Sequence, residues 1–168
     1  LVLDHGGRHN VIGGNWFFMR SDYGRFEITG TVPARLAVDL TVGSGDAEVA
    51  NLAALEAVVG SGDLDVERVP GAFKALVGSG EIKASRTGPV EIGSIGSGLL
   101  ELDTVEGPVS IGAIGSGEAK LRGGAGNVEV RTLGSGEIDA RDIRGDLVLR
   151  SKGSGTVVHR DVGGRVSL

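Results

Sequence analysis

The triplet Gly-Ser-Gly occurs seven times in this chain, and its copies follow one another at intervals of 17 to 19 residues. The copies begin at Gly43, Gly60, Gly78, Gly96, Gly115, Gly134 and Gly153. A short motif that returns at a nearly constant interval indicates a repeat architecture, in which every copy forms the same structural unit. The repeat therefore constrains the fold more than any local pattern does, and it says little about activity.

Within one repeat, apolar residues alternate with polar ones. The unit that starts at Gly134 places Ile138, Ala140 and Ile143 before a glycine, and Leu147 and Leu149 after it. Spacing of two residues in runs of three to five is typical of short β-strands. Each unit therefore contains two or three strands joined at glycine corners, and the sequence leaves the choice between two and three open.

A single unit of this size cannot bury its apolar residues, whereas stacked copies bury a continuous core. We therefore predict an all-β fold, a parallel β-helix (solenoid) of 18–19 residues per coil with roughly eight coils. Crossover connections between parallel strands favour a right-handed winding. A propeller needs about 40 residues per blade, and the consensus of leucine-rich repeats is missing.

The columns of the predicted stack can be taken directly from the repeat. The residue before each triplet forms an aliphatic column that we expect to face the core, ending in a lysine: Val42, Val59, Val77, Ile95, Ile114, Leu133 and Lys152. The residue after each triplet forms a largely acidic, outward column: Asp46, Asp63, Glu81, Leu99, Glu118, Glu137 and Thr156. Lys83 and Lys120 follow two residues along and are expected to pair with these acids.

Composition supports one folded domain spanning residues 1–168. The 31 glycines suit a fold with several tight corners per coil, since glycine adopts positive φ without steric cost. The net charge of −5 gives no basic footprint for nucleic acid or anionic lipid. No run of apolar residues approaches the length of a transmembrane helix, and the chain contains no cysteine.

Residues 1–35 depart from the repeat, and we expect them to form degenerate N-terminal coils and an aromatic cap before the regular coils of residues 36–168. Five of the six aromatic residues lie in residues 16–26. Terminal units of repeat arrays are atypical because they cover an exposed end of the core. The alternative is a binding platform on which Trp16, Phe18 and Tyr23 stack against a carbohydrate.

The segments GSGDLDV, GSGEIKA and GSGEIDA, in which an acid and an alternating apolar strand follow the triplet, resemble the bacterial head GIN domain family of autotransporter adhesins. The segment TVPARLAVDLTVGSGDAEV is similar to related adhesin domains with β-helical coils. The resemblance covers about residues 24–168. It implies a secreted, periplasmic or surface-attached bacterial protein, and it supplies no catalytic residues.

The triplets supply no catalytic or cofactor motif, because they match neither a phosphate-binding loop nor a nucleophile elbow. The stacked hydroxyls are predicted to form a structural ladder at one corner of the coil: Ser44, Ser61, Ser79, Ser97, Ser116, Ser135 and Ser154. An anion-binding nest of triplet N–H groups and a calcium site on the acidic column remain as alternatives. Asp4, His5 and His9 are a further candidate metal site. We predict no catalytic residue, no cofactor and no metal.

Three functional hypotheses follow. The favoured one is a non-catalytic surface or periplasmic binding or structural module, with a glycan or a cell-surface protein as partner. The second is a carbohydrate-active β-helix enzyme, which the near absence of insertions between repeats disfavours. The third is a scaffold that polymerises end to end, as bactofilins do. The C-terminal coil has no visible cap, so we also expect a weak homo-oligomer through that end.

Overall fold

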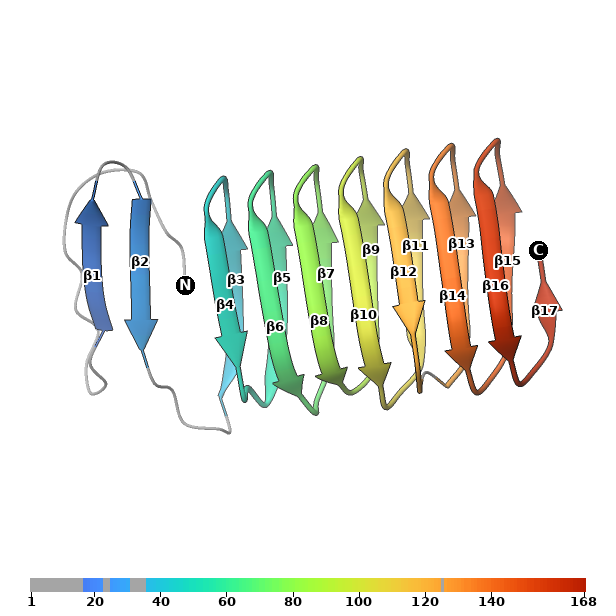
Figure 1. The fold of residues 1–168 in the computed structure, drawn as a ribbon, viewed down its shortest axis with the longest axis horizontal. Coiled ribbons are helices and arrows are strands. Elements are labelled where there is room, and N and C mark those ends of the chain that lie inside the picture. The colour runs from blue at the N-terminus through green and yellow to red at the C-terminus, as the bar shows by residue number, and fades with distance from the viewer. Residues whose placement is uncertain (1–16, 23–24, 31–35, 125) are drawn as a thin grey trace.

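The computed structural model describes residues 17–22, 25–30, 36–124 and 126–168, and every regular element in them is a β-strand. Figure 1 shows a row of stacked coils, each made of one strand at the back and one at the front. Among these residues, no helix has the length and apolar character needed to cross a membrane. The predicted all-β solenoid is therefore confirmed, and each coil has two strands.

The solenoid consists of two parallel sheets. The first sheet has eight strands: β3 (Ala37–Val42), β5 (Ala54–Val59), β7 (Phe73–Val77), β9 (Val90–Ile95), β11 (Val109–Ile114), β13 (Val128–Leu133), β15 (Leu147–Lys152) and β17 (Val166–Ser167). The second has seven strands: β4 (Asp46–Ala50), β6 (Asp63–Val69), β8 (Glu81–Thr87), β10 (Leu99–Val105), β12 (Glu118–Arg122), β14 (Glu137–Ile143) and β16 (Thr156–Val162). These strands make about seven turns, close to the predicted number.

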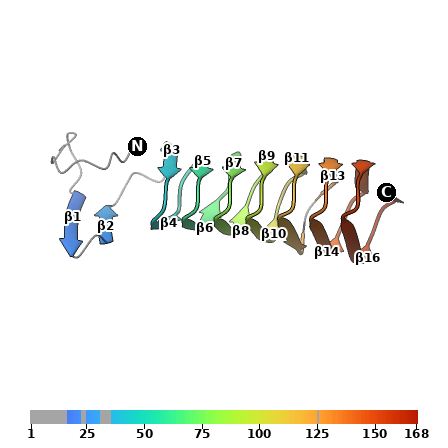
Figure 2. The same ribbon diagram turned by 90° about the horizontal axis from the view of Figure 1, so that it is seen from above.

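The winding of the coil is right-handed, as the sequence predicts. In Figure 1 the chain runs up through the eight-stranded sheet at the back and down through the seven-stranded sheet at the front, while it advances towards the C-terminus. Figure 2 shows the same two layers from above, with β3 and β4 on opposite sides of the stack. The Gly-Ser-Gly triplets join the strands at one edge of the stack, which we call the triplet edge.

The aliphatic column before each triplet lies in the core. Val59, Val77, Ile95, Ile114 and Leu133 stand one above another in consecutive coils, and each is at most 2% exposed. Only the last member, Lys152, is exposed, at the C-terminal end of the stack. The opposite sheet supplies matching columns, so the core is one continuous apolar cluster.

The reason for glycine in the triplets differs from the one that the sequence suggested. Among the described glycines, only Gly123 and Gly124 have positive φ, and neither belongs to a triplet. Glycine is required because the coils approach closely: a Cβ on Gly96 would lie 2.7 Å from the backbone oxygen of Gly78. A Cβ on Gly98 would overlap the backbone oxygen of Gly80 more severely. The triplet is thus a packing requirement between coils.

Left-handed backbone occurs instead at the eighth residue after the first glycine of each triplet. These residues have φ between 53° and 73° and stand in one column along the solenoid: Asn51, Arg68, Arg86, Thr104, Gly123, Asp142 and Asp161. This conformation is uncommon for residues other than glycine. It turns two successive side chains outward, such as those of Glu67 and Arg68, before Val69 points back into the core.

The two strands before the solenoid pair differently from those within it. β1 (Phe17–Asp22) and β2 (Arg25–Gly30) pair in antiparallel fashion as a hairpin, whereas all strands of the solenoid pair in parallel. Trp16 and Tyr23 of the candidate aromatic platform lie outside the described residues, as do Asp4, His5 and His9. The division of the chain at residue 35 stays a prediction.

One core position carries a polar group that the structure leaves without a partner. Thr87 is 1% exposed, and its Oγ1 has no hydrogen-bond partner among the described residues. Its neighbours in register are Val69 and Val105. A buried hydroxyl without a hydrogen bond costs about 1–3 kcal/mol, and valine has nearly the same shape as threonine.

We therefore expect Thr87→Val to raise the free energy of unfolding by about 1 kcal/mol, as measured by urea denaturation. The matched control is Thr132→Val, because Thr132 is exposed on β13 and should change stability by less than about 0.5 kcal/mol. A loss of stability in Thr87→Val would show that the hydroxyl is hydrogen-bonded in solution.

Candidate functional site at the triplet edge

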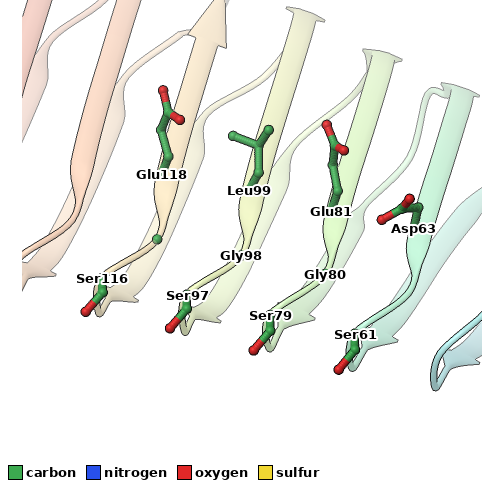
Figure 3. Close-up of a pocket in the computed structure, with 11 residues that line it drawn as sticks. Ser61, Asp63, Ser79, Gly80, Glu81, Ser97, Gly98, Leu99, Ser116 and Glu118 are labelled. Carbon is green, nitrogen blue, oxygen red and sulfur yellow. The ribbon is translucent and has the colours of Figure 1, made fainter.

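The predicted serine column lies along the triplet edge. All seven serines are exposed, and Figure 3 shows the hydroxyl groups of Ser61, Ser79, Ser97 and Ser116 pointing the same way from successive corners. None of the side-chain hydrogen bonds in the described part of the chain uses these hydroxyls. A ladder of bonded hydroxyls therefore stays a prediction, and the hydroxyls face solvent.

In the four central triplets, every backbone N–H group is used by the stack. In the triplet Gly78–Gly80, the three N–H groups donate to carbonyls of the preceding coil over 2.8, 2.7 and 3.1 Å. The same pattern repeats at the triplets that begin at Gly96, Gly115 and Gly134. The alternative of an anion-binding nest is therefore wrong at these corners, because no N–H group is left to bind an anion.

The serine column and the acidic column border a shallow groove of about 430 Å³. Figure 3 shows Asp63, Glu81 and Glu118 at the starts of their strands, next to the serines, with Leu99 between the two glutamates. Repetition of the coil places equivalent groups about 4.8 Å apart along the groove. The groove is thus a periodic array of hydroxyls and carboxylates, interrupted by one apolar side chain.

Lysines neutralise part of the acidic column, as the sequence predicts. Lys83 Nζ lies 2.9 Å from Glu81, and Lys120 Nζ lies 3.3 Å from Glu118 and 3.5 Å from Glu101. The hydrogen bond and the charge of Glu81 raise the pKa of Lys83, and those of Glu118 raise the pKa of Lys120. Both lysines therefore stay charged over the whole physiological range.

The acids do not assemble a metal centre within the described ranges 17–22, 25–30, 36–124 and 126–168. No group of three or more histidine, aspartate or glutamate side chains there has the geometry to hold a metal ion. His159 is exposed on β16. Of the aromatic platform, only Phe18 lies in a described strand, β1.

A family comparison decides the relationship of this chain to known proteins. The model of a family described as "Putative auto-transporter adhesin, head GIN domain" matches residues 73–160, which is just over half of the chain. The chain belongs to this family. The match spans β7 to most of β16, so the family resemblance inferred from the triplets is confirmed on the regular coils of the solenoid.

No curated protein and no solved structure matches the chain significantly. The family description is that of an adhesin, which fits a non-catalytic binding module at a cell surface. The description names no ligand for the head GIN domain.

Two features that shape the surface of this head GIN domain carry no clear signal in the sequence. The column of left-handed residues has no single amino-acid signature, since it contains Arg, Thr, Asn, Asp and Gly. At the edge opposite the triplets, Asn127 Oδ1 accepts a hydrogen bond from the N–H of Asp146, whose own Oδ1 accepts from the N–H of Arg165. The left-handed column precedes the second corner of each coil and these hydrogen bonds lie at it, so both features appear only when the coils are aligned there.

Proposed function

We propose that this protein is a non-catalytic binding module of the bacterial cell surface or periplasm, which offers flat, repetitive surfaces to a glycan or a cell-surface protein. The observation that carries the proposal is the shortness of the connections: from β3 to β17, consecutive strands are joined by two to five residues. Catalytic and small-molecule sites are concave, and such short corners build no walls around a cleft.

Of the surfaces on offer, the triplet edge suits an extended polar ligand best. The exposed serine hydroxyls can both donate and accept hydrogen bonds, and the neighbouring carboxylates accept them. A regular polymer that lies along the groove would meet the same groups in coil after coil. Each contact is weak, and repetition gives affinity through many of them together.

A glycan array tests the proposal. We expect the purified protein to bind one class of repeating glycan, and Ser79→Ala/Ser97→Ala/Ser116→Ala to lose about tenfold in affinity, because three exposed hydroxyls of the groove are removed at about 0.5 kcal/mol or more each. The matched control is Ser94→Ala/Ser110→Ala, which removes exposed hydroxyls from the eight-stranded sheet. Equal binding by both variants would exclude the triplet edge, and an array without any signal would count against a glycan ligand.

The alternative function, that of a carbohydrate-active enzyme, is tested by incubating the pure protein with polysaccharides. We propose that the protein lacks hydrolase activity, since the carboxylates Asp63, Glu81 and Glu118 line a shallow groove and no long connection between β3 and β17 builds the walls of a cleft around them. Turnover of a polysaccharide by the pure protein, abolished by one point mutation, would overturn this.

Fractionation of cells that produce the full-length gene product tests the proposed surface or periplasmic location.

Self-association through the C-terminal coil remains a proposal. β16 and β17 are the last strands of their sheets in the described part of the chain. Unpaired strand edges favour addition of another strand. Light scattering over a wide concentration range would show the resulting growth in mass.

A further inference from the structure

The outer surface of the seven-stranded sheet carries most of the charged side chains of the solenoid in four rows. The rows consist of the third, fifth, seventh and eighth residues after the first glycine of each triplet; on β6 these are Asp63, Asp65, Glu67 and Arg68. Strand register aligns the equivalent residues of β6 to β16 along the solenoid axis. We call this surface the seven-stranded face.

In the seventh and eighth rows of the seven-stranded face, the charges change sign across the middle of the sheet, between β10 and β12. The seventh row runs from acid to base: Glu67, Ser85, Asp103, Arg122, Arg141 and Arg160. The eighth row runs from base to acid: Arg68, Arg86, Thr104, Gly123, Asp142 and Asp161. The two rows are neighbours, so their opposite gradients cannot be the result of a simple charge difference between the two ends of the chain.

This pattern is complementary to itself. A two-fold axis parallel to the strands, passing between β10 and β12, places β16 of one copy over β6 of another, β14 over β8, and β12 over β10. Six kinds of opposite-charge pair then meet, each of them twice: Arg160 with Glu67, Asp161 with Arg68, Asp142 with Arg86, Asp139 with Lys83, Arg122 with Asp103, and Lys120 with Glu101. Only one kind of like-charge pair meets, Glu137 with Glu81, also twice.

We propose that the protein forms a symmetric dimer in which the seven-stranded faces of two copies pack against each other in this arrangement. Two-fold interfaces are isologous, so a surface that complements itself about one axis is the property that such a dimer requires. The proposal goes beyond the binding function. It leaves the serine column and the eight-stranded sheet free for a ligand, whereas the acidic column belongs to both the groove and the dimer face.

The pairing within one chain leaves charges unsatisfied on this face. Glu67 contacts both Arg68 and Arg86, and Arg141 binds Asp139 through two hydrogen bonds of 2.9 and 2.7 Å. By contrast, Arg122 and Arg160 form no ion pair with any residue that the structure describes.

The arginines of the seventh row also repel one another. Arg122, Arg141 and Arg160 are direct neighbours in register, about 4.8 Å apart, and like charges in such positions are destabilising. Acids of a second copy would relieve this repulsion.

The area of the seven-stranded face limits the expected affinity of the dimer. Six strands at a spacing of about 4.8 Å, with about five residues each, give a surface of roughly 30 by 17 Å. Two such surfaces bury about 1,000 Å² in total, near the lower limit for a specific complex. Because the contacts are charged and close to solvent, the dimer should be weak and should dissociate in high salt.

Sedimentation of the full chain in low and high salt tests the proposal. We expect a closed monomer–dimer equilibrium at low salt and monomers in 1 M salt, where the screening length falls to about 3 Å. Arg160→Glu and Glu67→Arg each place like charges opposite one another, so each variant should dimerise at least tenfold more weakly. An equimolar mixture of the two should recover the dimer, because the contacts between residues 160 and 67 then join opposite charges again.

Arg131→Glu is the matched control, since Arg131 is exposed on β13 of the other sheet and should behave like the native protein. Circular dichroism confirms that each variant keeps its strands. A native protein that stays monomeric at high concentration and low salt would overturn the proposal. A dimer that survives Arg160→Glu, or a mixture that fails to dimerise, would also overturn it.

A second measurement locates the interface directly. The chain contains no cysteine, so Asp63→Cys and Thr156→Cys each carry a single thiol. The proposed axis places residue 63 of one copy opposite residue 156 of the other, about 10 Å away, the usual distance between packed sheets. A thiol crosslinker of that length should join the two variants when they are mixed and leave each one alone largely unlinked. Failure to crosslink in dimer-forming conditions would overturn the arrangement.

Discussion

Ile114→Asp should unfold the central coils or lower the free energy of unfolding by about 5 kcal/mol or more. Ile114 is 1% exposed and stands between Ile95 and Leu133 in the core column. Loss of a buried isoleucine side chain alone costs about 2–5 kcal/mol, and an unpaired carboxylate in the same place adds a desolvation penalty. The total stability of a domain is about 5–15 kcal/mol, so this one change is of comparable size.

Urea denaturation with two controls separates these contributions. Ile114→Val should cost only about 0.5–1.5 kcal/mol, because it removes one methylene. Asp63→Asn, on an exposed side chain at the triplet edge, should change stability by less than about 0.5 kcal/mol. If Asp63→Asn were the more damaging change, the assignment of inward and outward columns would be wrong.

The defect in Ile114→Asp should also depend on pH. Burial raises the pKa of the introduced carboxyl in the folded state above its unfolded value of about 3.9. The folded state then holds the proton more tightly, so the loss of stability should be smallest below pH 4 and should grow as pH rises.

Gly98→Ala should destabilise the protein by about 3 kcal/mol or more, the upper part of the range for overpacking. A Cβ at Gly98 would overlap the backbone oxygen of Gly80 and come within 2.9 Å of Val77 Cγ1. The obstacle is backbone in the neighbouring coil, so no side chain can move to make room. The coil must shift instead, which strains the hydrogen bonds that Gly98 and Leu99 donate to Gly78 and Gly80.

The chain supplies its own matched control for this substitution. Gly45 occupies the same position in the first triplet, and nothing described lies within 4 Å of a Cβ built there. Gly45→Ala should therefore be neutral or slightly stabilising, since alanine reduces the entropy of the unfolded chain. Equal effects of Gly45→Ala and Gly98→Ala on the denaturation midpoint would show that glycine serves another purpose in the triplet.

The candidate site could be predicted only in part. The triplet spacing places Ser79, Ser97 and their equivalents in one column and the acids in the next, and both columns lie where the repeat predicts. The pairing of Lys83 with Glu81 also follows from their separation of two residues along a strand. Two features could be established only from the structure, because they depend on the distance between coils: the groove between the columns, and the use of the triplet N–H groups by the preceding coil.

The sequence by itself determined the solenoid, its core columns and the family. A period of 17 to 19 residues that keeps aliphatic residues before each triplet is compatible with few ways of burying apolar surface, so Val77, Ile95 and Ile114 had to stack. The sequence did not distinguish two strands per coil from three, because alternation of apolar and polar residues along a strand does not reveal where the chain turns at its second corner. That corner carries a glycine in six of the seven repeats, but strands such as β8 and β10 continue through the left-handed column before it, where Arg86 and Thr104 adopt a conformation that their residue types disfavour.

The tertiary structure also decided what the glycines and the outer charges mean. Positive φ was the expected reason for the triplet glycines, whereas close approach of successive backbones is the observed one. The opposite charge gradients of the seventh and eighth rows become visible only when the coils are aligned, since Glu67 and Arg160 are 93 residues apart in the chain. Local sequence fixes which side of a strand a residue faces, but only the stacking of coils decides which residues share a surface.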